Sequence, residues 1–185
     1  MSEHWTTEAS EVLIEDRWIH LQKQRVRTPK GAVLDPYYLL TYSDWAVTVA
    51  ITDADKVVLV RQYRHGTASV SLELPGGCVD PSDETPLHAS LRELEEETGY
   101  GGEGRYIGSL AANPALQTNR LHVALMTGAE KRHAPRLEHG EELSTVLMPV
   151  ADAIALAASG GMEQSMHVAA LFMALSHAGR LVPSP

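Results

Sequence analysis

Residues 76–100 read GGCVDPSDETPLHASLRELEEETGY, and this stretch predicts a helix with well-marked ends. Thr85 is a residue type that caps helices, and Pro86 suits the first helical turn. Gly99 suits the left-handed conformation that commonly ends a helix. Three leucines at helical spacing share one face, which is expected to pack on the core: Leu87, Leu91 and Leu94.

A second arc of the same helix carries three glutamates at positions i, i+3 and i+4: Glu93, Glu96 and Glu97. Carboxylates at this spacing repel one another, and the repulsion grows near a protein wall because the effective dielectric falls. A bound divalent cation would explain the crowding, and oxygen-only ligands suit Mg²⁺ or Mn²⁺. Arg92 projects to the other side of Glu93 and is suited to a bidentate ion pair with a carboxylate. The alternative is a solvated acidic face, which the helix caps, the leucine face and the preceding glycines disfavour.

Apolar and β-branched segments on both sides of this stretch predict a sheet. Residues 11–42 are expected to form strands, with a turn at residues 28–31 (TPKG), where Pro and Gly stand at favoured turn positions. Further strands are expected at 46–51, 56–63, 105–110, 121–126 and 144–148, a glycine loop at 75–77, and helices at 152–158 and 164–177. An apolar stripe marks the last helix: Val168, Leu171, Phe172 and Leu175. Many strands among few helices favour a mixed α/β sandwich over a doubly wound parallel sheet.

Composition limits the classes of function. The chain has 185 residues and a net charge of −9, so it is a poor candidate for gripping nucleic acid by bulk charge. The single cysteine, Cys78, excludes an internal disulfide and suits a cytoplasmic protein. No run approaches the length of a membrane span, and the first residues lack the layout of a signal peptide. We therefore expect neither a nucleic acid nor a membrane as partner.

The stretch resembles the Nudix box: Gly, five residues, Glu, seven residues, Arg-Glu, an apolar residue, any residue, Glu-Glu, any residue, Gly and an apolar residue. Residues 92–100 (RELEEETGY) match the second half of that pattern completely. Six residues instead of five separate Gly77 from Glu84, and the extra residue lies in the turn-like segment 80–83. Whether Glu84 or Asp83 corresponds to the first Glu of the pattern stays open.

Residues 60–64 (VRQYR) and 72–77 (LELPGG) extend the resemblance to the ADP-ribose and nucleotide-sugar pyrophosphatase branch of that family. The resemblance implies a Nudix α/β/α sandwich of mixed sheet, preceded by an N-terminal antiparallel β segment. Residues 1–44 are expected to form that segment and to serve dimerisation, and residues 45–185 the hydrolase domain. With its aromatic residues, the β-rich N-terminus predicts a homodimer in which this segment crosses to the partner.

The same resemblance implies Mg²⁺-dependent hydrolysis, with Mn²⁺ as an alternative ion. The substrate would be ADP-ribose or a related nucleoside diphosphate sugar, and the products a nucleoside monophosphate and a sugar phosphate. Two alternatives remain: another nucleoside diphosphate derivative as substrate, or a non-catalytic module that binds nucleotide sugars.

The expected roles as metal ligands come from the positions of this sequence that match the Nudix box. The resemblance implies that Glu93 and Glu97 are direct ligands, that Glu96 assists, and that the backbone carbonyl of Gly76 is a further ligand. Arg92 and Glu96 are also expected among the catalytic residues.

The branch usually supplies a further acid from a loop after the box, as base or extra ligand. The matching loop is 137–143 (LEHGEEL), and Glu141 is the residue we select, with Glu138 and Glu142 as alternatives.

Four residues are expected to contact substrate. The guanidinium fork of Arg64 suits phosphate oxygens, and Arg61 is a second candidate for the same role. Glu73 is expected to accept hydrogen bonds from ribose hydroxyls or to support the metal site. Trp45 is one of several aromatic residues that can stack on a base. The structural alternatives are a surface ion pair for each arginine, a strand end for Glu73 and core or dimer packing for Trp45.

Overall fold

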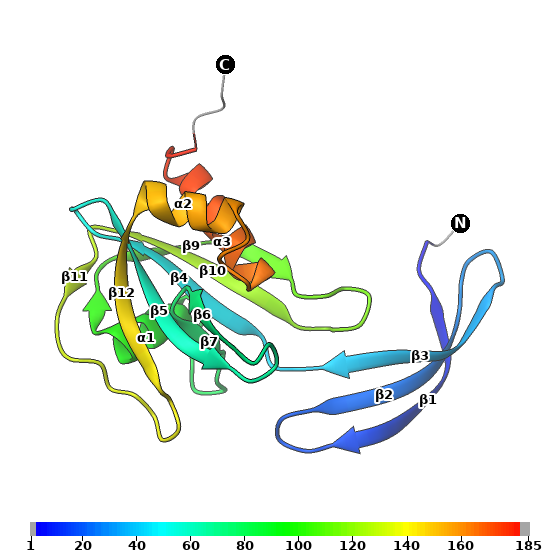
Figure 1. Cartoon of the computed structure of the whole chain (residues 1–185). Helices are drawn as coiled ribbons and strands as arrows, with labels where there is room; N and C mark the ends of the chain where they lie inside the picture. The colour runs from blue at the N-terminus through cyan, green and yellow to red at the C-terminus, as the bar shows by residue number, and fades with distance from the viewer. Residues whose placement is uncertain (1–2, 182–185) are drawn as a thin grey trace. The chain divides into compact units, whose positions relative to one another are not determined.

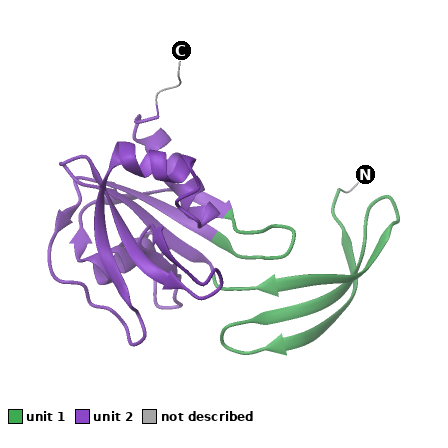
Figure 2. Cartoon of the chain, viewed as in Figure 1, with its two compact units in different colours: residues 1–43, 111–120 green, residues 44–110, 121–185 purple. Residues whose placement is uncertain are grey.

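A computed structural model of the chain describes residues 3–181. The chain divides into two compact units (Figure 2). One contains the N-terminal residues up to 43 together with 111–120, and the other contains 44–110 and the residues from 121 onward. Each unit is described by itself.

The first unit is a three-stranded antiparallel sheet in the order β1 (Thr6–Glu15), β2 (His20–Arg27) and β3 (Val33–Thr41). The predicted turn at residues 28–31 is confirmed, because Gly31 N donates to Thr28 O at 2.9 Å. Gly31 has a φ of 88°, a conformation that favours glycine. The strands begin earlier than expected, at Thr6. Loop 111–120 belongs to this unit because it hydrogen-bonds to β3 through Leu116 O and Leu40 N, 2.8 Å apart.

A mixed seven-stranded sheet forms the centre of the second unit (Figure 1). Its main order is β12 (Leu143–Pro149), β5 (Lys56–Arg64), β4 (Trp45–Ile51), β10 (Arg120–Thr127) and β9 (Gly104–Ala111). β6 (Ser69–Glu73) pairs with β5, and β7 (Gly76–Cys78) pairs with β4. The β4–β10 pair is parallel, whereas β12–β5 and β4–β7 are antiparallel. Two short strands, β8 (Tyr100–Gly101) and β11 (Glu130–Lys131), form a separate pair.

The glycine loop expected at residues 75–77 is partly wrong, since Gly76–Cys78 forms strand β7. Gly76 lies opposite Val47 in the sheet, and a Cβ at this glycine would fall 2.2 Å from Ala46 O. The missing side chain therefore allows the strand to lie close against β4, which residue propensity alone does not predict.

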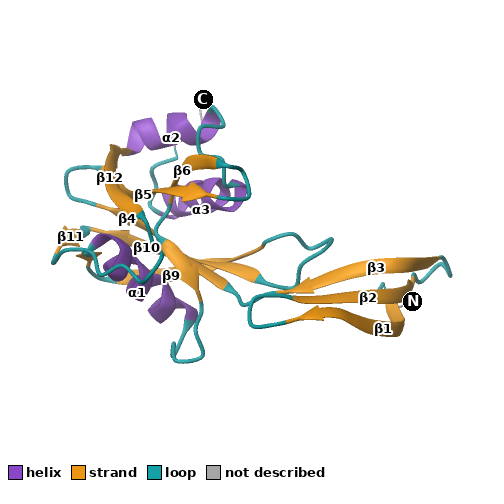
Figure 3. Cartoon of the chain, turned by 60° about the horizontal axis from the view of Figure 1, so that its bottom comes forward, coloured by secondary structure: helices purple, strands orange, loops and turns teal. Residues whose placement is uncertain are grey.

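Helices cover both faces of this sheet (Figure 3). Val47, Val49 and Ile51 of β4 pack in a core with α2 (Val150–Ala158) and α3 (Ser165–His177). The stripe predicted on α3 contributes to that core. On the other face, Ala50 of β4 packs with Leu94 of α1 (Pro86–Thr98). The predicted α/β/α sandwich is therefore confirmed, with α1 as one outer layer and α2 and α3 as the other.

The predicted ends of α1 are also confirmed. Thr85 Oγ1 accepts from His88 N at 3.1 Å, and Gly99 has a φ of 66° while its N donates to Glu95 O at 2.8 Å. Leu94 is fully buried and Leu91 packs beside it, whereas Leu87 is half-buried and lies outside this cluster. Burying one such leucine stabilises the fold by roughly 1.5–3 kcal/mol, which anchors α1 on the sheet. In the part of the chain described, no helix is long and apolar enough to cross a membrane.

Candidate functional site

The acidic arc of α1 does not form a solvated surface. Glu97 is 4% exposed, and the side chain of Glu93 is 13% exposed. Glu96 is more open, at 35% of its side chain. Two of the three carboxylates are therefore removed from water. Holding like charges close together costs more free energy in such a buried environment than in water.

This burial changes the acidity of both groups. Removal from water raises the pKa of Glu93 to about 7, against the opposing effect of the nearby Arg92 guanidinium. Burial raises the pKa of Glu97 to about 8, although a hydrogen bond from the Gly76 N–H acts in the opposite direction. The charge of Glu141 adds to the rise at both positions.

Two adjacent glycines border these acids for different reasons. Gly76 N donates to Glu97 Oε2 at 2.8 Å, which ties strand β7 to helix α1. A Cβ at Gly77 would fall 2.5 Å from Glu93 Oε1, so the carboxylate occupies the space that a side chain would need. The expected ligand role of the Gly76 carbonyl stays a prediction.

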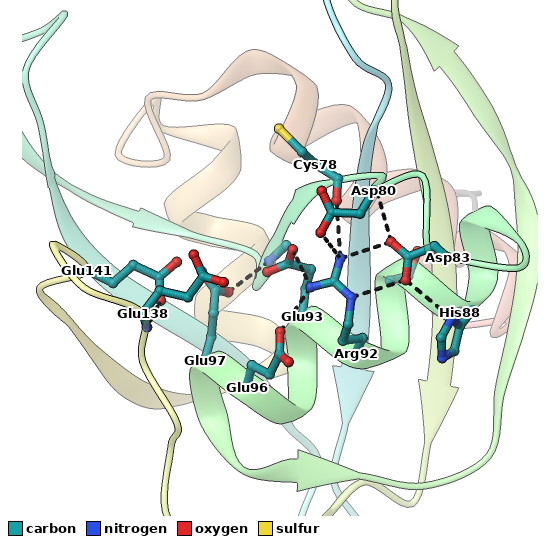
Figure 4. A network of polar contacts seen from close by, with 12 residues as sticks. Cys78, Asp80, Asp83, His88, Arg92, Glu93, Glu96, Glu97, Glu138 and Glu141 are labelled. Atoms are coloured by element: carbon teal, nitrogen blue, oxygen red, sulfur yellow. Dashed lines mark hydrogen bonds and ion pairs between the residues drawn. The ribbon is translucent and has the colours of Figure 1, made fainter. Parts of the chain in front are cut away.

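Arg92 is the centre of the polar network on α1 (Figure 4). Its Nε and Nη2 donate to both oxygens of Asp83, at 3.1 and 3.0 Å. Its Nη1 donates to Glu93 Oε1 at 3.0 Å and to Glu96 Oε2 at 2.9 Å. The bidentate pair expected for Arg92 is therefore made with Asp83, and the same guanidinium orients two of the three acids.

The contacts of Arg92 also distinguish Asp83 from Glu84, the two candidates for the first Glu of the box pattern. The Asp83 side chain is 1% exposed, whereas Glu84 is exposed. Hydrogen bonds from Arg92 hold the pKa of Asp83 below its usual value. A tight turn presents this carboxylate, because Asp83 N donates to Asp80 O and Asp80 N donates to Asp83 Oδ2. Asp83 therefore makes the contact with the box arginine that Glu84 does not make.

Among the loop acids, Glu141 has a charge that acts on the buried pair. It raises the pKa of both Glu93 and Glu97. Glu138 N donates to Glu141 Oε2 at 2.8 Å, which orients the Glu141 carboxylate (Figure 4). Glu142 instead lines a separate cavity with Arg61.

A cavity of about 330 Å³ lies beside the two glycines. Its lining brings together residues that the sequence singled out and residues that it did not: Trp45, Arg64, Gly76, Gly77, Gln164 and His167. Because Gly77 contacts Glu93, the cavity and the acidic cluster share strand β7. Arg61 lies in the other cavity, of about 370 Å³, so the structure does not bring the two candidate arginines together.

Arg64 is held by Glu73. Its Nε lies 2.9 Å from Oε1 and its Nη2 lies 2.6 Å from Oε2 of that carboxylate. Glu73 is 1% exposed, and although burial opposes ionisation, Arg64 keeps its pKa below the usual value. The Glu73 carboxylate is thus buried and bound to Arg64, and its expected contact with ribose hydroxyls or support of the metal site stays a prediction. Glu73 positions the guanidinium, and Arg64 remains the residue that faces the cavity.

Sequence reasoning missed His167. It lies on the apolar helix α3, and its Nδ1 accepts a hydrogen bond from Leu74 N at 3.1 Å across a separation of 93 residues. A single histidine in a helical pattern carries no signal of such a distant contact.

The donor chemistry of the acidic cluster fits a hard divalent cation. Its side-chain ligands would all be carboxylate oxygens, and a cation would offset the raised pKa of Glu93 and Glu97. Within residues 3–181 no group of three or more His, Cys, Asp or Glu side chains is gathered as a finished metal site. Here Arg92 binds Glu93 and Glu96, and the Gly76 N–H binds Glu97.

Comparison with known proteins agrees with this geometry. The NUDIX domain model matches residues 43–168, and the model of a nucleoside diphosphate sugar hydrolase N-terminal domain matches residues 5–40. The ADP-sugar pyrophosphatase of Mus musculus is 28% identical, over 92% of this chain and 87% of its own. The ADP-ribose pyrophosphatase of Mycobacterium tuberculosis is 28% identical, over 91% of this chain and 83% of its own. A crystal structure of an ADP compounds hydrolase has the same fold, with a TM-score of 0.79 at 23% identity, covering 96% of this chain and 97% of that one. The family model spans more than half of the sequence, and the chain therefore belongs to the Nudix hydrolase family.

Proposed function

We propose that this protein hydrolyses the diphosphate bond of ADP-ribose or a related nucleoside diphosphate sugar in a Mg²⁺-dependent reaction. The products are a nucleoside monophosphate and a sugar phosphate. The observation that carries the proposal is the buried pair Glu93 and Glu97, with raised pKa values, beside a cavity that contains the Arg64 guanidinium. The match of the N-terminal segment to nucleoside diphosphate sugar hydrolases supports the substrate class.

The residues that would hold Mg²⁺ are Glu93 and Glu97, with Glu96 assisting and the Gly76 carbonyl as a further ligand. When bound, such an ion shields phosphate charge and lowers the pKa of a bound water. Mn²⁺ is expected to substitute because it accepts the same oxygen ligands. Arg92 keeps Glu93 and Glu96 oriented through the contacts at 3.0 and 2.9 Å.

Arg64 binds the diphosphate in this proposal. Its Nε and Nη2 are occupied by Glu73, which leaves Nη1 without a hydrogen bond to the described residues. That free edge can donate to a phosphate oxygen. Trp45, in the same cavity, offers an aromatic face to the substrate.

Glu141 accepts the proton of the attacking water. Its carboxylate is exposed and is oriented by the N–H of Glu138, so it is accessible to solvent and to a bound ligand. A carboxylate within hydrogen-bond reach of the attacking water can serve as the general base.

A substrate panel tests the proposal. The purified protein is incubated with ADP-ribose, other nucleoside diphosphate sugars and a dinucleoside diphosphate, with Mg²⁺, with Mn²⁺ and with EDTA. Released monophosphates are detected with a phosphatase and an inorganic phosphate reagent. Turnover of a diphosphate sugar that requires the metal supports the proposal. Preference for a different nucleoside diphosphate derivative would contradict the substrate, and no turnover of any compound would contradict the reaction.

A further inference from the structure

The corner between β6 and β7 is tied to four different elements by four consecutive residues. Glu73 binds Arg64 of β5, and the Leu74 N–H binds His167 of α3. Pro75 O accepts from Thr48 N of β4 at 3.1 Å, and Gly76 N donates to Glu97 of α1. His167 therefore belongs to the same rigid corner that borders the acidic cluster.

The contact with Leu74 determines the tautomer of His167. Since Nδ1 accepts a backbone N–H, it carries no proton, and the ring proton is on Nε2. Burial lowers the pKa of His167 to about 4, so the ring is neutral at physiological pH. The groups that face this ring are Glu73, with Oε2 at 3.9 Å from Nδ1, and the nearby Arg64.

The remaining donor of His167, its Nε2–H, has no partner among the described residues. The side chain is 9% exposed, and within residues 3–181 no hydrogen bond is made by its Nε2. His167 lines the cavity of about 330 Å³ together with Arg64 and Gln164. Nε2 is not among the buried side-chain atoms that lack a partner, so this donor is open to the cavity, where the oxygen of a ligand can accept its hydrogen bond in place of water.

The rest of the cavity indicates which acceptor fits. Met166 and Leu121 make part of its wall apolar, and the donors beside His167 are the free edge of the Arg64 guanidinium and the amide of Gln164. A cluster of donors with no carboxylate among the lining residues suits an oxygen-rich group, such as a sugar carrying a phosphate.

We propose that His167 is a substrate-binding residue, whose Nε2–H donates to a sugar hydroxyl or phosphate oxygen of the bound substrate beside Arg64. The inference rests on the proposed function, because it takes the cavity to be part of the nucleotide-sugar site. It assigns two roles to one ring: Nδ1 holds the β6–β7 corner, and Nε2 binds the ligand.

The first test observes the ring directly. The full chain labelled with ¹⁵N-histidine is titrated with AMP and with ribose 5-phosphate in Mg²⁺, and with ADP-ribose in EDTA, so that no probe is consumed. At saturation the Nε2–H proton of His167 is expected to move to lower field, while the signals of the exposed His177, at the end of α3, serve as an internal reference. A response to ribose 5-phosphate assigns the contact to the sugar phosphate half, and a response to AMP assigns it to the nucleotide half.

The second test uses two variants, each of which keeps the hydrogen-bonding function of only one of the two ring nitrogens. His167→Asn keeps an acceptor near the position of Nδ1 and removes the Nε2 donor, whereas His167→Gln places an amide near Nε2 and removes the acceptor for Leu74. We expect KM to rise about tenfold for His167→Asn, with kcat nearly unchanged, and to recover in part for His167→Gln. A residue with only a structural role would give the opposite order, with His167→Asn close to the wild type.

The outcomes separate this inference from the proposed function. Binding of the probes with no change at the His167 Nε2–H in response to any of them would overturn the inference alone. A shifted Nε2–H without any turnover would overturn the proposed hydrolysis and keep the binding role. If none of the three probes binds, both are wrong.

Discussion

The Arg92 guanidinium and the Asp83 carboxylate form a paired contact, with Nε 3.1 Å from Oδ1 and Nη2 3.0 Å from Oδ2. The third nitrogen of the same group reaches Glu93 and Glu96. The pair thus joins the loop before α1 to the acids on α1, and a change at Asp83 should be transmitted to those acids through Arg92.

Asp83→Asn is expected to lower both stability and activity, since it leaves Arg92 with a weaker partner. The loss of stability should be about 1–3 kcal/mol at pH 7. Because Arg92 lowers the pKa of Asp83 in the folded protein, this contribution is complete above the unfolded pKa and is lost as pH falls through the folded pKa. Chemical denaturation at pH 7 and at pH 3 measures the difference. Glu84→Gln is the matched control, and an equal effect of the two changes would contradict the assignment of Asp83.

Glu97→Gln should abolish Mg²⁺-dependent turnover while the protein remains folded. The carboxylate is buried beside Glu93, and the neutral amide cannot replace it as an anionic ligand. Steady-state assays with a diphosphate sugar, together with circular dichroism, provide the measurement. Glu95→Gln, on the same helix but paired with Arg132, is the control and should keep most of the activity. Normal turnover by the Glu97 variant would contradict the metal assignment.

Metal-free protein is expected to lose stability between about pH 5 and pH 8. The folded-state pKa values of Glu93 and Glu97, about 7 and about 8, lie above the values of the unfolded chain. For an acid raised in this way, unfolding becomes more favourable as pH rises through that interval. Mg²⁺ should reverse the trend because it binds the ionised forms, so its effect on Tm should be larger at pH 8 than at pH 6. An equal Tm increase at both pH values would contradict this expectation.

Arg64→Lys should raise KM by about 10- to 100-fold, since lysine keeps the charge but loses the planar fork that binds Glu73 and a phosphate together. The lysine also leaves the buried Glu73 with a weaker contact, so a lower Tm is expected as well. Arg61→Lys is the matched control because Arg61 lies in the other cavity. Kinetics in which the Arg61 variant shows the larger defect would reverse the assignment of the phosphate-binding arginine.

We expect the protein to form a homodimer through its N-terminal unit, because this unit exposes apolar side chains. All residues of β1 are exposed, including Val12, Leu13 and Ile14, and Trp18 after it is 68% exposed. Apolar residues gathered on a thin sheet commonly mark an interface between proteins. Light scattering at micromolar concentration should give about twice the 20.1 kDa of one chain, and Ile14→Asp should lower that mass. A monomer in the unmodified protein would contradict the prediction.

Much of the site was readable from the sequence because its signals are local. The contacts that cap α1 join residues three or four positions apart, and the spacing of Glu93, Glu96 and Glu97 on one helix follows from helical geometry alone. The β-branched runs and the turn at residues 28–31 likewise act over short distances, and the strands and the layered fold followed from them.

Only the tertiary structure decided the rest, because those contacts join residues that are far apart in the chain. The choice of Asp83 over Glu84 depends on which carboxylate turns toward Arg92, nine residues from Asp83. The burial of Glu73 against Arg64 joins two strands, and His167 gave no signal because its partner Leu74 is 93 residues away. Burial, desolvation and long-range hydrogen bonds arise only when the chain folds, so the local pattern of residues does not predict them.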